Sequence, residues 1–327
     1  MTQNNKIPRL LTPKNTYTFD YQEAIEAAKT QRSIFWLPDE IEVEKDIQDI
    51  KVNMTEAESH GVTHTLKLFT HYELFAGNEY WGSRVCKSFQ RPDIQQMANC
   101  FSFFELNVHA PFYNKLNEAL GLNTDEFYNS YVNDPILKKR MEFIDEAVNN
   151  ENELISLGVF SLVEGVILYS SFAFLKHFQA QGKNLLSHVV SGINFSVRDE
   201  ALHSEGGAWL YRTLKGEGYA TDKQVEKIEA EIVRQAFLIE EHECRIIDMI
   251  FEKGSITGIT DKQLKHFVQS RINLCLKNLG IDPIFEISYN PISKWFYKGI
   301  NSIQFHDFFA KTGNEYNREW SEEKFSW

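Results

Sequence analysis

The residues best suited to chemistry in this chain are an isolated glutamate and a glutamate–histidine pair on two apolar, helix-forming segments. Glu164 lies in the sequence FSLVEGVILYSSF, and Glu200 and His203 lie in the sequence RDEALH. An ionised carboxylate among apolar side chains costs several kcal/mol unless a cation or hydrogen bonds compensate. Residues three apart on a helix share one face. These three side chains are therefore typical of half of a site for two metal ions in a four-helix bundle.

The other half of such a site must lie upstream, where further carboxylates and a histidine occur. Glu105 and His109 lie in FSFFELNVHAPFY, and Glu73 lies in FTHYELFAG. A donor set of carboxylate oxygens and imidazole nitrogens suits iron or manganese better than a metal that prefers thiolates. The predicted ligands are Glu73, Glu105, His109, Glu164, Glu200 and His203.

Each motif has a simpler interpretation when it stands alone. A Glu-x-x-His sequence arises by chance on many helices, and a lone buried glutamate such as Glu164 is commonly a salt-bridge partner between helices. Several such motifs on consecutive long helices favour a metal centre instead.

The elements that must position these residues are helices, because apolar residues recur at helical spacing and strand-like alternation is scarce. Segments of about 25 to 30 residues exceed the mean helix of about 11 to 12 residues, which favours a helical bundle. The fold class we predict is all-α, with long helices at residues 56–81, 93–120, 152–180, 184–215 and 222–253, and shorter ones at 21–33, 134–150 and 261–279.

Composition limits where the protein works and what it binds. A net charge of -12, from 46 acidic and 34 basic residues, opposes direct binding to nucleic acid. No apolar run approaches the roughly 18 residues that span a bilayer, and the N-terminus lacks an apolar signal core. The four cysteines have no C-x-x-C spacing. We expect a cytoplasmic protein with reduced thiols and no membrane association.

With these motifs the chain resembles the small, radical-generating subunit of class I ribonucleotide reductase, of the ferritin-like superfamily. The resemblance runs from the sequence SIFW at residues 33–36, through RDEALH at 198–203, to Asn290-Pro291 and the sequence DFF at 307–309. It implies a ferritin-like helical bundle with additional flanking helices. It also implies a homodimer that passes a radical to a large catalytic subunit, which reduces ribonucleotides.

The resemblance also implies roles for individual residues. Tyr113 matches the tyrosine that carries the radical, and Trp36 matches the tryptophan of the electron-transfer route. Asp199 matches the aspartate that links this tryptophan to a ligand histidine, here His109. Two irons are the first expectation for the metals, with a manganese–iron pair or two manganese ions as alternatives.

The chain departs from the family pattern at the upstream ligands. The family motif is usually Glu-x-x-His-x-x-x-Tyr, whereas Glu105 and His109 are four residues apart. A π-bulge can absorb one extra residue, so we predict irregular helix there and keep Glu105 as the ligand. The family interval before Pro92 falls on Leu74, and we expect its neighbour Glu73 to coordinate. Glu79 fits the helix face less well.

The end of the chain differs from the rest. We expect a helical metal-binding domain with an N-terminal extension over residues 1–302 and a flexible tail over 303–327. The tail combines aromatic and acidic residues without helical periodicity, and the resemblance implies that it docks on the large subunit with Tyr316 in a radical relay. Its possible anchors are Trp320, Phe325 and Trp327.

Other functions would use a similar helical bundle. A ferritin-like oxidase or monooxygenase acting on a small substrate would share the metal site, and so would an iron-storage protein, but neither needs Trp36 or an aromatic tail. A scaffold protein would bind no metal at all. Retention of metal would argue against a scaffold protein. Activity that depends on a large partner subunit would argue against an oxidase or a storage protein.

Overall fold

The chain folds into an all-α structure, as the sequence predicts. The computed structural model describes residues 7–180 and 182–297. Within these residues there is no strand, only an isolated bridge between Ile256 and Ile259. The principal helices are α1 (Gln22–Ser33), α2 (Glu56–Phe75), α4 (Pro92–Phe104), α5 (Ala110–Leu120), α6 (Asp125–Asn133), α7 (Pro135–Val148), α8 (Glu153–Val166), α9 (Tyr169–Lys176), α10 (Ser187–Gly216), α11 (Asp222–Ile250), α12 (Asp261–Leu279) and α13 (Pro291–Phe296).

Local sequence signals set several helix ends. Thr55 begins α2 with a capping box, in which its hydroxyl accepts from the Glu58 N–H and the Glu58 side chain accepts from the Thr55 N–H. Thr260 begins α12 in the same way with Gln263. Gly280 ends α12 in the left-handed conformation, with φ of 79°. The helix predicted over residues 261–279 is therefore confirmed at both ends.

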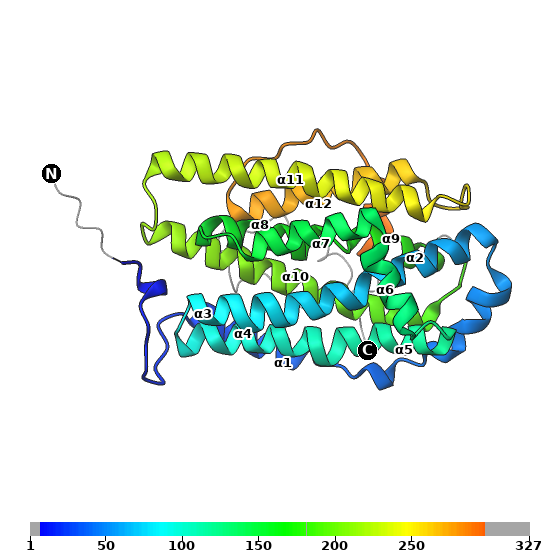
Figure 1. The fold of residues 1–327 in the computed structure, drawn as a ribbon, viewed down its shortest axis with the longest axis horizontal. Helices are drawn as coiled ribbons and strands as arrows, with labels where there is room; N and C mark the ends of the chain where they lie inside the picture. Colours follow the sequence, from blue (N-terminus) through cyan, green and yellow to red (C-terminus); the bar gives the residue numbers. More distant parts are fainter. Residues whose placement is uncertain (1–6, 181, 298–327) are drawn as a thin grey trace.

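Four helical segments lie side by side and form the centre of the bundle (Figure 1). They are α2, the continuous segment from α4 to α5, α8 and α10. α8 packs against α10 on one side, and α11 and α12 cover its opposite side. α2 packs against α5, and α1 lies along α4 as a flanking helix. The hydrophobic core runs through all of these contacts, so residues that point inward from the four central segments meet in a dry interior.

Two details of the predicted helices differ from the structure. The segment expected as one helix over residues 152–180 is divided, because the α-helical pattern stops at Val166 and begins again at Tyr169. The short helices α6 and α13 were not predicted, since neither carries a long apolar repeat.

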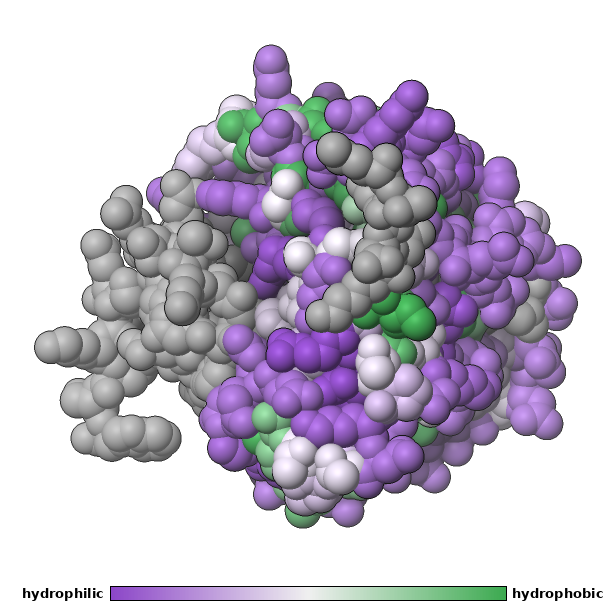
Figure 2. All heavy atoms as spheres, turned by 90° about the vertical axis from the view of Figure 1, so that its left-hand side faces the viewer, coloured by the Kyte–Doolittle hydropathy of each residue, from purple (hydrophilic) through white to green (hydrophobic). Residues whose placement is uncertain are grey.

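One apolar segment has the length and composition of a membrane span but belongs to the core. It covers Glu153–Gln179, and 94% of an 18-residue apolar window within it is buried inside the protein. Its apolar character follows from packing on all sides, as expected for a helix surrounded by other helices. The end of the molecule shown in Figure 2 is mostly hydrophilic, with small separate hydrophobic areas.

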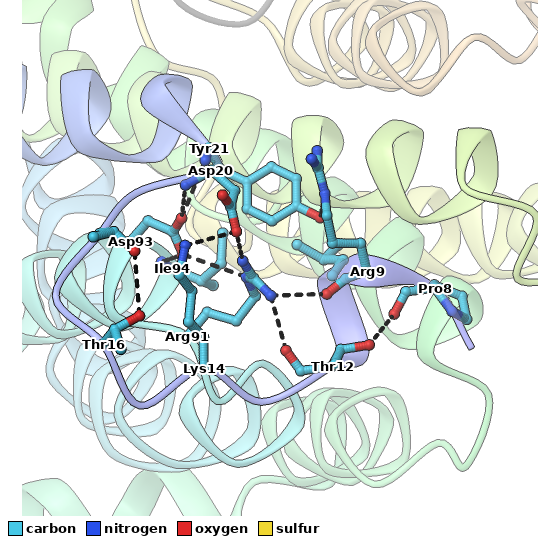
Figure 3. A network of polar contacts seen from close by, with 12 residues as sticks. Pro8, Arg9, Thr12, Lys14, Thr16, Asp20, Tyr21, Arg91, Asp93 and Ile94 are labelled. Atoms are coloured by element: carbon cyan, nitrogen blue, oxygen red, sulfur yellow. Dashed lines mark hydrogen bonds and ion pairs between the residues drawn. The ribbon is translucent and has the colours of Figure 1, made fainter. Parts of the chain in front are cut away.

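The N-terminal segment is fastened to the start of α4 by a buried arginine (Figure 3). Arg91 donates to the carbonyl oxygens of Arg9 and Thr12 and pairs with the Asp20 carboxylate. The Asp93 carboxylate accepts the backbone N–H groups of Asp20 and Tyr21. These contacts fix the chain that leads into α1 and, beyond it, to Trp36.

Candidate metal centre

The structure brings all six predicted ligands together in the middle of the bundle. They form two groups, and in each group one ligand atom per residue lies within 4.8 Å of the others. None of the six side chains is more than 2% exposed. The first group is Glu73, Glu105, His109 and Glu200, and the second is Glu105, Glu164, Glu200 and His203. Glu105 and Glu200 belong to both groups, so the geometry is that of two neighbouring ion sites bridged by two carboxylates.

A π-helical turn places Glu105 and His109 on the same side of their helix. The turn covers Glu105–His109, between α4 and α5, which confirms the predicted irregularity. A π turn accommodates one more residue than an α turn, so a four-residue interval can present both side chains to one site. The Nδ1 atom of His109 lies 2.9 Å from Glu105 Oε2 and 3.2 Å from Glu200 Oε1.

A second π-helical segment explains the position of Glu73. It covers Ala76–Val85, directly after α2, so extra residues are accommodated between Glu73 and Pro92. The Glu73 side chain is fully buried, with its Oε2 atom 3.5 Å from His109 Nδ1. Leu74 is 43% exposed, and Glu79 lies at the surface. Of the residues considered for this position, the structure brings only Glu73 into the cluster.

The buried polar atoms of the cluster fit a pair of cations. Both carboxylate oxygens of Glu73 and of Glu200, together with both ring nitrogens of His203, make no well-aligned hydrogen bond among the described residues, and their close polar contacts are with other members of the cluster. Four carboxylates and two imidazoles without compensating lysine or arginine would be costly in a dry interior. Two divalent ions bound by oxygen and imidazole donors supply both the charge and the coordination.

The electrostatics of the cluster without metal keep protons on several ligands. Burial, followed by repulsion from Glu105 and Glu200, raises the pKa of Glu73 well above its usual value. Burial and the carboxylates of Glu200 and Glu105 do the same for the pKa of Glu164. Burial opposes charge on His203, but the carboxylates of Glu105 and Glu200 together outweigh it and raise the pKa of His203 to about 9. At neutral pH His203 therefore holds a proton that a metal ion must displace, and the raised pKa values of Glu73 and Glu164 favour their protonated forms.

We therefore expect metal affinity to rise with pH. Below the raised pKa values of Glu73, Glu164 and His203 the ligands are protonated, so binding releases protons and weakens as pH falls. Each displaced proton changes the affinity by about tenfold per pH unit. Titration of metal-free protein with Mn²⁺ at pH 6, 7 and 8, with circular dichroism to check the fold, measures this. An affinity that stays constant over this range would contradict the account.

A line of hydrogen bonds connects the cluster to Trp36. The indole Nε1–H of Trp36 donates to Asp199 Oδ2 at 2.8 Å, and the same oxygen lies 3.1 Å from His109 Nε2. Trp36 is 3% exposed and Asp199 is fully buried. Arg198 donates to the Ile34 carbonyl at 2.6 Å and so holds the segment before Trp36 in place. No role was predicted for this arginine from the sequence.

Tyr113 lies one helical turn beyond His109, in α5, and is fully buried. Its ring stacks on Phe69 at a centroid distance of 4.3 Å, and Phe69 stacks on Phe172. Its hydroxyl has no hydrogen-bond partner among the described residues. Burial, foremost, and the Glu73 carboxylate raise the pKa of Tyr113 well above its usual value, so the phenol stays protonated. Tyr316 lies outside the described residues.

Two residues that the sequence analysis did not single out hold the predicted ligand Glu164. The indole N–H of Trp81 donates to Glu164 Oε1 at 2.6 Å, and the Tyr72 hydroxyl donates to Glu164 Oε2 at 3.3 Å. Trp81 comes from the π-helical segment Ala76–Val85 and Tyr72 from α2. In the sequence, these two residues are marked only by their proximity to Glu73. Their contact with Glu164 depends on how the helices are aligned against each other, which the sequence spacing does not give.

Comparison with known proteins gives consistent results. A family model described as ribonucleotide reductase, small chain, matches residues 13–291. The probable ribonucleoside-diphosphate reductase small subunit 048L of Invertebrate iridescent virus 3 is 24% identical, with 94% of this chain and 85% of the viral protein covered. The ribonucleoside-diphosphate reductase subunit M2 of Mesocricetus auratus is also 24% identical, over 92% of this chain and 75% of that protein.

Solved structures share the fold. The dimanganese(II) NrdF of Streptococcus sanguinis matches with a TM-score of 0.75 and 22% identity, covering 88% of this chain and 99% of that one. A putative class I ribonucleotide reductase from Bacillus halodurans matches with a TM-score of 0.76 and 22% identity, covering 85% of this chain and all of that one. The ferritin-like bundle expected from the sequence is confirmed.

Proposed function

The chain belongs to the ribonucleotide reductase small-chain family, and we propose from this membership and from the buried cluster how it generates a radical. As a small subunit of ribonucleotide reductase it is part of an oxidoreductase. The observation that carries the proposal is that two ligand groups share Glu105 and Glu200, deep in a dry bundle, with Asp199 joining the cluster to Trp36.

The residues fit two metal ions. Glu73 and His109 would hold one ion, Glu164 and His203 the other, and Glu105 and Glu200 would bridge them. We expect two irons, with a manganese–iron pair or two manganese ions as alternatives, since oxygen and imidazole donors accept all three combinations. When bound, such a pair supplies oxidising power drawn from oxygen.

The surrounding side chains then determine what is oxidised. Tyr113 would give up one electron to the loaded metal pair and would become the tyrosyl radical, and the proton of its hydroxyl group would end in the water to which oxygen is reduced. Phe69 and Phe172, which are both fully buried, exclude the water that would quench it. Tyr72 and Trp81 hold the Glu164 carboxylate from both of its oxygens, which limits its movement. Trp36, through Asp199 and His109, is the route by which the electron hole leaves the site.

Trp36→Phe tests this route. We expect the variant to keep its metals and its tyrosyl radical, because an aromatic ring still fills most of the space and the predicted ligands are untouched. It should lose ribonucleotide reduction in the presence of the large subunit, since phenylalanine has no N–H for Asp199 and is harder to oxidise. Metal content, electron paramagnetic resonance and turnover are measured on the same sample. Turnover at the level of the unchanged protein would remove Trp36 from the route.

The partner we propose is the large catalytic subunit, bound through residues 303–327 with Tyr316 in the relay. This tail lies outside the described residues, and the proposal rests on its composition and on family membership. We also propose a homodimer and a cytoplasmic location. Free thiols at all four cysteines agree with a reducing compartment. The alternative of an oxidase acting on a small substrate has no use for the Trp36 connection.

A further inference from the structure

A second group of metal-binding side chains lies away from the bundle centre. It consists of His60 and His64 in α2 and Glu252, which follows the end of α11, and we call it the α2–α11 site. One ligand atom of each residue lies within 4.8 Å of the other two. His64 precedes Glu73 by nine residues on the same helix, which corresponds to roughly 14 Å along the axis. The α2–α11 site is therefore separate from the candidate metal centre.

We propose that the α2–α11 site binds a single divalent transition-metal ion such as zinc. His60 and His64 are four residues apart, so both rings lie on one face of α2, with their centroids 4.2 Å apart. The third donor comes from another element, with Glu252 Oε2 lying 3.6 Å from His60 Nε2. Two imidazoles and one carboxylate are a common ligand set for zinc, which completes its coordination with water.

The surroundings of His60 and His64 favour neutral imidazole rings, which can bind a metal ion, over protonated rings, which cannot. The Nε2 atom of His60 also lies 3.1 Å from the Met249 carbonyl, a contact that helps to orient the ring. Burial, then the neighbouring His60 and Lys67, lower the pKa of His64 to about 4, so its ring is neutral at pH 7. A neutral imidazole is the form that binds metal.

The exposed fractions of the side chains show that an ion can reach the α2–α11 site and that one of its ligands can move. The His60 side chain is 16% exposed, whereas the Glu252 side chain is 65% exposed. Metal–ligand bonds of about 2.0–2.2 Å need donors closer together than 4.8 Å, and the exposed Glu252 is the residue free to move inward. A bound ion would join α2 to the turn after α11. It would therefore stabilise the folded chain as well as occupy the site.

Zinc binding to iron-loaded protein tests the proposal. We expect about one zinc ion per chain to bind without loss of iron, as counted by elemental analysis after gel filtration. The melting temperature should rise when zinc is added. The His60→Gln/His64→Gln double variant should lose the added zinc and the rise in melting temperature. Glu252→Gln, at an exposed position, should weaken zinc binding by roughly tenfold or more.

The matched control is His266→Gln, which removes a partly buried histidine of α12 outside the site and should bind zinc like the unchanged protein. Equal zinc binding by the double variant and the unchanged protein would overturn the proposal. So would an absence of zinc binding in protein that retains its iron. Neither result bears on the six ligands at the bundle centre, because iron content is measured separately.

Discussion

Glu200→Ala is expected to abolish metal loading at both ion positions. Glu200 belongs to both ligand groups, so its removal deprives each ion of a donor and leaves the remaining buried ligands without a bridge. We expect less than one metal ion per chain after reconstitution with iron or manganese, as measured by elemental analysis. The tyrosyl radical and ribonucleotide reduction should disappear together, a loss of several orders of magnitude in rate.

Glu205→Ala is the matched control for this variant. Glu205 lies on the same helix, α10, but its carboxylate pairs with Arg212 at 2.8 Å and lies outside the cluster. Loss of a partly exposed ion pair costs roughly 1 kcal/mol or less, so this variant should fold and load metal normally. A full complement of two ions in Glu200→Ala would count against the assignment of Glu200 as the shared ligand.

Tyr113→Phe is expected to keep both metal ions and to lose the tyrosyl radical. The change removes one hydroxyl from a ring that packs on Phe69 and contributes no ligand atom, so the bundle and the metal site should remain intact. Without the hydroxyl, the ring cannot release a proton as it loses an electron, and no phenoxyl radical can form there. Electron paramagnetic resonance after aerobic reconstitution measures the signal, alongside metal content.

Tyr80→Phe is the control for Tyr113→Phe. Tyr80 is also fully buried, but it stacks on Phe160 and supplies no ligand atom to either group of the cluster. Its radical signal should match that of the unchanged protein. An unchanged tyrosyl signal in Tyr113→Phe would remove Tyr113 from the radical role, while the metal assignment would stand.

The helical fold was predictable because long amphipathic repeats with clear ends dominate the chain. The candidate ligands of α8 and α10, which the structure brings together, were predictable from carboxylates in apolar surroundings and from the i, i+3 spacing of Glu200 and His203. The first half of the site was harder, since π-helical turns shift the register that α-helical spacing assumes. The extra residue between Glu105 and His109 was a visible signal of one such turn.

Contacts made across the bundle were beyond what spacing can predict. Tyr72 and Trp81 meet the Glu164 carboxylate only because α2 and its π-helical continuation pack in one register against α8. Neither residue has a pattern that distinguishes it from ordinary core aromatics. The short helices α6 and α13 were missed for a related reason, because brief segments depend on their neighbours for stability more than on their own periodicity.

The most direct test of the central claim is anomalous X-ray scattering from crystals of metal-loaded protein. The account predicts two neighbouring peaks, one bounded by Glu73 and His109 and the other by Glu164 and His203, with Glu105 and Glu200 between them. An absence of metal density among these residues, or a single ion held without Glu200, would contradict it.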